Sequence, residues 1–84
     1  MSISDKTKRI IVVGFEGVQL LDLAGPSDVF SVANVFVPDA YEVNFVGTQS
    51  DVAATSGLKL GLNRLPRITM SDTILVPGGP AKAV

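Results

Sequence analysis

A run of β-branched residues near the N-terminus places the strongest constraint on the fold. Residues 9–14 read RIIVVG, an almost unbroken apolar stretch that ends at a glycine. Uninterrupted apolar strands are typical of parallel sheets covered on both faces, whereas half-exposed strands alternate apolar and polar residues. We therefore expect a buried strand of an α/β fold over residues 9–14, followed by a turn over residues 15–19 at its carboxyl end.

The next segment predicts a helix that begins at a proline. Gly25 and Pro26 interrupt the sequence LLDLAGPSDVFSVAN, and proline is favoured in the first turn of a helix but not inside one. We therefore expect a short turn over Leu20–Ala24 and a helix from about Pro26 to Asn34. Asp28 would then lie in the first turn, where its charge suits the helix dipole.

The remaining sequence predicts further strands. Residues 41–47 (YEVNFVG) alternate as a strand does, and residues 51–62 contain two short strand-like pieces, either a hairpin or a strand and its return. Residues 73–76 (TILV) are another short apolar strand, closed by the sequence Pro-Gly-Gly. Strand, helix and strand in this order indicate a right-handed parallel βαβ unit.

Composition excludes several classes of function. The 84 residues include no cysteine and no histidine, which excludes disulfides, thiolate nucleophiles, an imidazole base and most zinc sites. A net charge of −1 offers no basic field for a nucleic-acid backbone, so we expect no nucleic-acid binding through this chain. No apolar run approaches the roughly 18 residues of a membrane span, and the polar N-terminus predicts no secretory signal. We therefore expect a cytoplasmic protein without a membrane partner.

Asp22 is the first candidate functional residue. Its sequence neighbours are all apolar: Leu20, Leu21, Leu23 and Ala24. It follows the first strand, and ligands of α/β sheets bind beyond the carboxyl ends of the strands. In an apolar crevice its protonated form is favoured, which suits a general acid or base or a hydrogen-bond partner for a ligand. The alternative interpretation is a structural aspartate that caps a helix or binds the backbone of a turn.

Gly78 and Gly79 are the second candidate. Two glycines after a buried strand allow close approach of the backbone, and their N–H groups are suited to an anion or oxyanion site. The alternative interpretation is a tight turn. Neither a P-loop nor a dinucleotide-binding fingerprint is present. Glu16 and Asp22 are a low-specificity signal for magnesium, so we expect no metal and no cofactor.

Three blocks resemble a known family in order and spacing. They are FEGVQLLDLAGPSDVFSVAN, YEVNFVGTQSDVAATSGLKL and DTILVPGGP. Together they resemble the first half of a ThiJ/PfpI-type domain of the class I glutamine amidotransferase-like superfamily, and most of all the N-terminal sensor domain of AraC-type transcriptional regulators. Isonitrile hydratases share nearly the same blocks. The joint presence of G-V-x-x-L-D-L-x-G-P and L-V-P-G-G makes the resemblance fairly specific.

This resemblance implies a fold and a division of the chain. The fold would be a truncated three-layer α/β architecture with a mostly parallel sheet, of the class I glutamine amidotransferase-like (flavodoxin-like) type. Residues 1–8 would be a flexible tail, and residues 9–84 the N-terminal part of a ThiJ/PfpI-like domain. Homodimerisation is common in the family, so a second copy is an expected partner beside a small-molecule ligand. The parallel sheet would have an uncovered edge, which predicts aggregation or dependence on a partner.

The resemblance also implies roles for single residues. Asp22 matches the acidic residue beside the family's nucleophile pocket, and Gly78 and Gly79 match the glycines whose backbone lines the oxyanion side of that pocket. Pro26 matches the proline that starts the first helix. The family's nucleophile lies further along the fold than Val84, so we expect no catalysis by this chain alone.

Three functions remain open at this point. The first is a small-molecule-sensing domain fragment of an AraC-type regulator. The second is a fragment of an isonitrile hydratase or a related cysteine-dependent hydrolase or lyase. The third is a fold remnant without an activity of its own, because the fold by itself does not decide between them.

Overall fold

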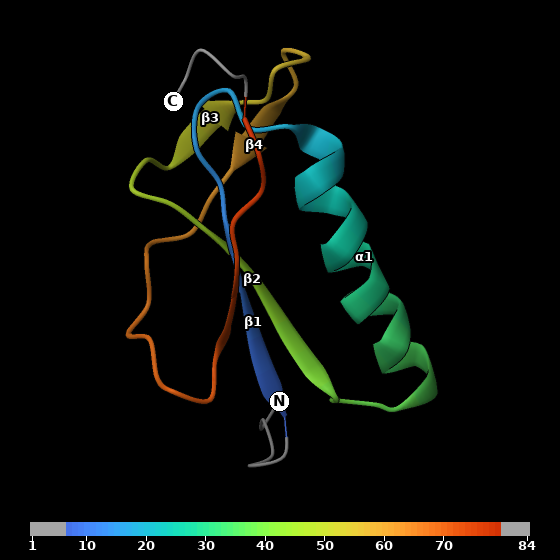
Figure 1. Ribbon diagram of the computed structural model, residues 1–84. Coiled ribbons are helices and arrows are strands. Elements are labelled where there is room, and N and C mark those ends of the chain that lie inside the picture. Colours follow the sequence, from blue (N-terminus) through green and yellow to red (C-terminus); the bar gives the residue numbers. More distant parts are fainter. Residues whose placement is uncertain (1–6, 80–84) are drawn as a thin grey trace.

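A parallel sheet and one long helix form the framework of the structure (Figure 1). The computed structural model describes residues 7–79. Strands β1 (Lys8–Val13), β2 (Tyr41–Val46) and β5 (Thr73–Leu75) form the sheet in the order β2-β1-β5, and both pairings are parallel. Helix α1 (Leu20–Phe36) connects β1 to β2. The predicted parallel βαβ unit and the small α/β fold are thus confirmed.

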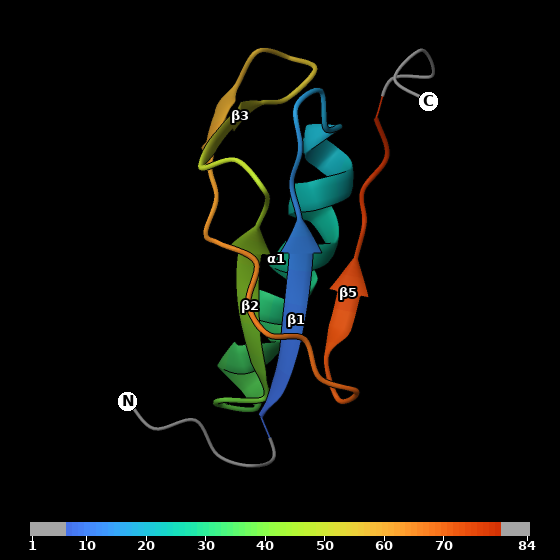
Figure 2. The same ribbon diagram turned by 90° about the vertical axis from the view of Figure 1, so that its left-hand side faces the viewer.

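The central strand is buried, as its unbroken apolar sequence predicts. Ile10, Ile11 and Val12 are each at most 2% exposed. Helix α1 covers one face of the sheet, and the irregular segment of residues 62–72 crosses the other face (Figure 2). Within the described residues, the layer opposite α1 is therefore this irregular segment and not a second helix.

Helix α1 begins at Leu20, so the prediction that it starts at Pro26 is wrong. Pro26 lies inside the helix, where it offers no N–H to the carbonyl of Asp22 and costs about 3 kcal/mol relative to alanine. Burial of the core-facing side chains, among them Leu23 at 5% exposure, favours the longer helix in spite of this cost. Asp22, and not Asp28, is therefore the acidic residue of the first turn.

The two strand-like pieces of residues 51–62 form an antiparallel hairpin of β3 (Asp51–Ala53) and β4 (Lys59–Gly61). Gly57 in its turn has a φ of +91°, which few residues other than glycine adopt. The hairpin interpretation is thus the correct one of the two alternatives. The hairpin lies beyond the carboxyl end of β1, next to the start of α1 (Figure 1).

The first strand starts inside the predicted tail of residues 1–8. Lys8 pairs with Tyr41 of β2, and the hydroxyl of Thr7 donates to the carbonyl of Asp39 at 2.6 Å. The rest of the predicted tail, residues 1–6, lies outside the described residues, as do residues 80–84.

An ion pair joins the start of β1 to the segment that precedes β5. Arg9 Nε donates to Asp72 Oδ1 at 3.0 Å, and Arg9 Nη2 donates to Asp72 Oδ2. The backbone N–H of Thr69 donates to Asp72 Oδ2 at 2.8 Å. The hydrogen bond from Arg9, followed by that from Thr69, lowers the pKa of Asp72 to about 2. This pair supports the register of β5 beside β1.

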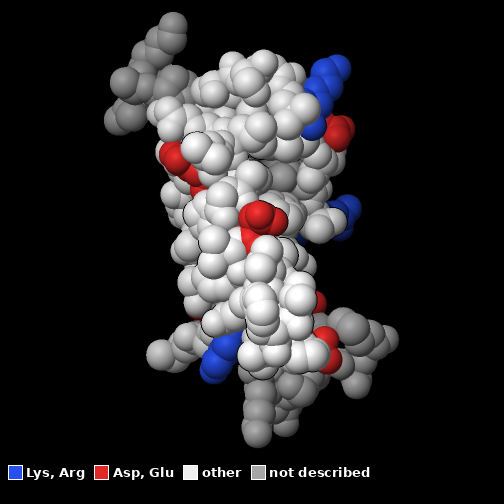
Figure 3. Space-filling view, turned by 90° about the vertical axis from the view of Figure 1, so that its right-hand side faces the viewer, with Lys and Arg blue, Asp and Glu red and all other residues white. Residues whose placement is uncertain are grey.

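The outer face of α1 carries an exposed apolar stripe. The stripe consists of Leu21, Val29, Val32 and Phe36, which are 79%, 68%, 48% and 80% exposed. Their spacing in the sequence places them on one side of the helix. The surface on this side of the molecule is mostly uncharged (Figure 3).

The outer edge of β5 has no strand partner among the described residues. No helix of the described part has the length and apolarity needed to cross a bilayer.

Candidate functional site

The loops that follow β1 and β5 meet at the carboxyl edge of the sheet. The backbone N–H of Gln19, at the start of α1, donates to the carbonyl of Gly78 at 2.9 Å. From β1 the chain passes through α1 to β2 on one side, whereas β5 lies on the other side. This is the topological switch point at which open α/β sheets bind their ligands. The structure thus brings two of the predicted sequence blocks together where the fold favours a site.

A cavity of about 300 Å³ opens beside this contact. Its wall comes from the first two turns of α1 and from the end of β5 with the residues that follow. The lining residues are Leu21, Asp22, Pro26, Leu75, Val76, Pro77 and Gly78. Asp22 is the one ionisable residue among them, so a single carboxylate faces an otherwise apolar wall.

Asp22 and Gly78 are in close contact. A β-carbon built on Gly78 would lie 3.1 Å from Asp22 Oδ2 and 3.5 Å from Gln19 Oε1. A side chain at position 78 would therefore crowd the carboxylate. The close backbone approach that the sequence predicted is found at Gly78.

The predicted apolar enclosure of Asp22 is wrong, because its side chain is exposed in the described structure. Successive helix residues point in directions about 100° apart, so neighbours in sequence do not surround one another. Leu23 turns into the core at 5% exposure, while Leu21 is 79% exposed. Asp22 therefore lies at the rim of its cavity.

The alternative interpretation of Asp22 as a helix cap does not hold either. Gln19 occupies the N-cap position, and it makes no side-chain capping bond. None of the interactions within residues 7–79 engages the Asp22 carboxylate. Its place in the first turn is electrostatically favourable for a negative charge. Asp22 is thus a carboxylate without a structural partner among the described residues.

Gly79 packs beside the cavity instead of lining it. A β-carbon on Gly79 would lie 3.1 Å from Phe15 Cε2 and 3.6 Å from the carbonyl oxygen of Gly17. The residue therefore allows the loop after β5 to lie against the loop after β1. Whether its N–H serves an anion, as the resemblance implies, stays a prediction.

Glu16 does not join Asp22 in a shared site. Glu16 Oε1 accepts a hydrogen bond from the backbone N–H of Ala53 at 2.9 Å, which ties this side chain to the hairpin. Within residues 7–79, no three acidic side chains come together as metal ligands. The two carboxylates that suggested a magnesium site in the sequence therefore do not form one together.

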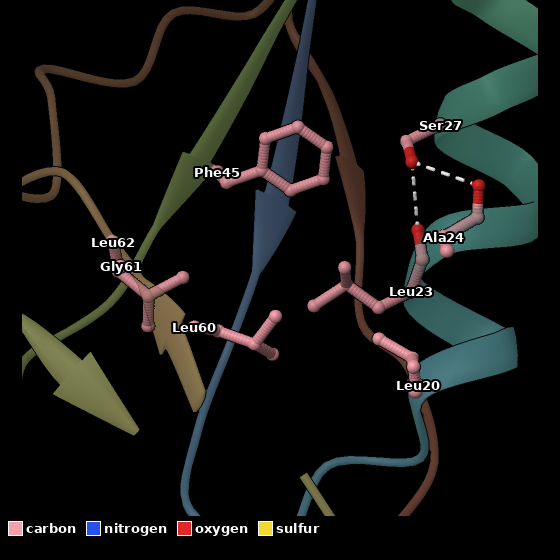
Figure 4. Close-up of a pocket in the computed structure, with 8 residues that line it drawn as sticks. All are labelled: Leu20, Leu23, Ala24, Ser27, Phe45, Leu60, Gly61 and Leu62. Atoms are coloured by element: carbon pink, nitrogen blue, oxygen red, sulfur yellow. Dashed lines mark hydrogen bonds between the residues drawn. The ribbon is translucent and has the colours of Figure 1, made fainter. Parts of the chain in front are cut away.

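A second cavity, of about 260 Å³, lies on the core side of α1 and was not predicted from the sequence (Figure 4). Its lining residues are Leu20, Leu23, Ala24, Ser27, Phe45, Leu60, Gly61 and Leu62. The signal was present in the spacing of Leu20, Leu23 and Ser27. A small serine at a position that faces the core leaves space that a larger side chain would fill.

A known protein is similar to this chain in sequence. No family model matches the chain. Over 75 residues the chain is 39% identical to an uncharacterized protein in the cpoL 5' region of Streptomyces lividans. That match covers 87% of this chain and 52% of the Streptomyces protein.

The fold is similar to part of a solved structure. The crystal structure of an AraC family transcriptional regulator from Pseudomonas putida superimposes with a TM-score of 0.76 at 19% sequence identity. The superposition covers 88% of this chain and 48% of the regulator chain. The chain thus spans about half the length of both proteins, and its parallel sheet with one helix is an arrangement that also occurs in an AraC family regulator.

Proposed function

We propose that this chain is a small-molecule-binding part of an AraC-type transcriptional regulator, with its ligand site in the cavity of Asp22 and Gly78. The observation that carries the proposal is the partnerless Asp22 carboxylate, which lies against Gly78 at the switch point of the sheet. The similarity to an AraC family regulator supports the regulatory class. We further propose that the domain is of the ThiJ/PfpI type, cytoplasmic, and a homodimer.

The chemistry of the wall defines the class of ligand. Asp22 accepts hydrogen bonds and attracts a cation, whereas Leu75, Val76 and Pro77 offer apolar contacts. A small molecule that carries an ammonium or another strong hydrogen-bond donor on a compact apolar body matches both. A carboxylate ligand would instead meet the charge of Asp22 and be repelled.

Titrations followed by NMR of the backbone amides test this site with three matched compounds: benzylamine, benzyl alcohol and benzoate. We expect benzylamine to bind most tightly, benzyl alcohol more weakly and benzoate not at all. Loss of a charge-assisted hydrogen bond predicts an affinity for benzylamine about tenfold lower in Asp22→Asn. Asp28→Asn, in the same helix but outside the cavity wall, serves as the control and should bind as the wild type does.

Equal binding of benzylamine by the wild type and by Asp22→Asn would refute the site.

The regulatory class is tested separately in the source organism, with Asp22→Asn and Asp28→Asn introduced at the native locus. We expect the transcript profile of the Asp22→Asn strain to match that of a deletion strain, and the Asp28→Asn strain to match the parent. A deletion that leaves all transcripts unchanged would refute the regulatory class. The benzylamine titration would still decide by itself whether the site exists.

No observation within the described residues favours the hydratase alternative. The chain contains no cysteine and no histidine, and Asp22 is the one ionisable residue that lines the cavity. A bound carboxylate by itself orients a ligand and accepts its hydrogen bonds. Binding is therefore the chemistry that this arrangement supports best.

A further inference from the structure

The cavity on the core side of α1 is bounded by three different elements. The first two turns of α1 form one wall, Phe45 near the end of β2 forms another, and β4 with Leu62 forms the third (Figure 4). The cavity shares no lining residue with the cavity of Asp22. The two lie on opposite sides of the start of α1, so the second is a separate space and not an extension of the first.

The hairpin wall of this cavity is held in place by backbone hydrogen bonds. The N–H of Gly17 donates to the carbonyl of Ala53 at 2.8 Å, and the N–H of Thr55 donates to the carbonyl of Val18 at 3.0 Å. These bonds fix the hairpin to the loop after β1. The hairpin is therefore tied to the loop that leads into α1.

Leu62 is fixed by two glycines. A β-carbon on Gly47 would lie 2.6 Å from Leu62 Cδ1, and one on Gly14 would lie 2.8 Å from Leu62 Cδ2. The side chain thus sits directly on two backbone segments at the carboxyl ends of β1 and β2. This wall is preorganised, and the volume beside it stays open.

The wall of the cavity is apolar apart from one hydroxyl group. Ser27 is 4% exposed, and its Oγ donates toward the carbonyls of Leu23 at 2.9 Å and Ala24 at 3.0 Å. Since the single hydroxyl proton is engaged there, the oxygen keeps a lone pair with which it can accept. An ordered water needs two to four polar partners. The lining side chains include no charged group and only the hydroxyl of Ser27 as a polar one, so they offer a water too few partners.

We propose that this cavity binds a compact, uncharged molecule with one ring and a single hydroxyl group, which donates its hydrogen bond to Ser27 Oγ. An apolar cavity of about 150 Å³ already binds benzene, so about 260 Å³ admits a ring with small substituents. The proposal does not rest on the function of the Asp22 cavity, because the two walls and the two ligand classes are different.

NMR titrations with p-cresol, toluene and benzoate test this proposal on the full chain. We expect saturable shifts from p-cresol and toluene in residues of β4 and of the core side of α1, and none from benzoate. In Ser27→Ala the affinity for p-cresol should fall about fivefold, to that for toluene, because only p-cresol uses the hydroxyl. The affinity for toluene should stay unchanged in this variant.

A variant that fills the cavity supplies the second arm of the test. Ala24 lines the cavity from α1 with a small side chain, so Ala24→Leu adds volume to the lining and should abolish binding of p-cresol and toluene. Gly25→Val is the control, since a β-carbon on Gly25 meets no atom within 4 Å and the residue lies outside the cavity lining. Ser27→Leu fills the space from the next turn of the helix if Ala24→Leu fails to fold.

The titrations of the filling variants and the control decide whether this cavity is a ligand site. Loss of both ligands in a folded filling variant, with normal binding in Gly25→Val, supports the site. Absence of saturable binding to the wild type, or binding that survives both filling variants, overturns it. Asp22→Asn should leave the affinity for p-cresol unchanged, so failure of the Asp22 site and failure of this one are distinguishable.

Discussion

The carboxylate of Asp22 lies beside Gly78, with Oδ2 3.1 Å from the position that a β-carbon on Gly78 would occupy. The two residues come from different elements, the first turn of α1 and the loop after β5. The hydrogen bond from Gln19 N–H to the Gly78 carbonyl holds these elements together. A glycine at position 78 thus keeps space for the carboxylate.

Replacement of Gly78 by alanine should impair the ligand site more than the fold. The new β-carbon would crowd Asp22 Oδ2, but the exposed Asp22 side chain can rotate away. We expect a change of less than about 1 kcal/mol in the free energy of unfolding, measured in urea, and at least fivefold weaker binding of benzylamine, about 1 kcal/mol. An unchanged affinity for benzylamine in Gly78→Ala would show that binding does not require the Asp22 carboxylate to keep the position that it has in the structure.

Acid should weaken the fold through Asp72. Arg9 first, and the Thr69 backbone second, lower the pKa of Asp72 from 3.8 to about 2. Because the folded state has the lower pKa, the unfolded chain takes up the proton more readily. The stabilisation is therefore complete above a pH of about 4 and is lost as the pH falls from about 4 to about 2.

Urea unfolding of the wild type, Asp72→Asn and Arg9→Met across this pH range checks the expectation. Both variants should be less stable than the wild type at neutral pH, and both should lose part of the dependence on acid. If the free energy of unfolding of Asp72→Asn fell with decreasing pH as steeply as that of the wild type, other carboxylates would be responsible for the acid dependence.

Gly47→Ala should destabilise the chain by about 1–3 kcal/mol through overpacking. The added β-carbon would lie 2.6 Å from Leu62 Cδ1 and 2.8 Å from the backbone oxygen of Gly14, and that oxygen belongs to a strand end that cannot easily move. Gly25→Ala is the control. No atom surrounds its β-carbon, and alanine is favoured over glycine in a helix by up to about 1 kcal/mol. Similar urea midpoints for the two variants would contradict the packing of Leu62.

The outer face of α1 should promote self-association of the isolated chain. Val29 and Phe36 are 68% and 80% exposed, and exposed apolar patches of this kind favour aggregation. We expect Val29→Lys with Phe36→Lys to lower the average mass in sedimentation experiments at high protein concentration. Met70→Lys, at an exposed apolar residue away from this stripe, should not lower it. A wild-type chain that stays monomeric throughout would refute the expectation.

The succession of strands along the chain and the proximity of Asp22 to Gly78 followed from local signals. An unbroken apolar run predicted β1 as a buried strand, and parallel strands place the residues that follow them at one edge of the sheet. Asp22 and Gly78 both follow such strands, so their proximity could be anticipated. The start of α1 could not, because the local cost of Pro26 is outweighed by the burial of Leu23 and its neighbours against the sheet.

The sequence by itself therefore determined the class of fold, the succession of strands and the residues that gather at the switch point, since each depends on periodicity and turn chemistry within a few residues. Only the tertiary structure decided that Asp22 lies exposed at a cavity rim and that a second cavity opens beside Ser27. Both depend on how α1 and the hairpin are placed against β1 and β2. That placement arises from contacts between distant residues, such as those of Leu62 with Gly14 and Gly47, which no local pattern encodes.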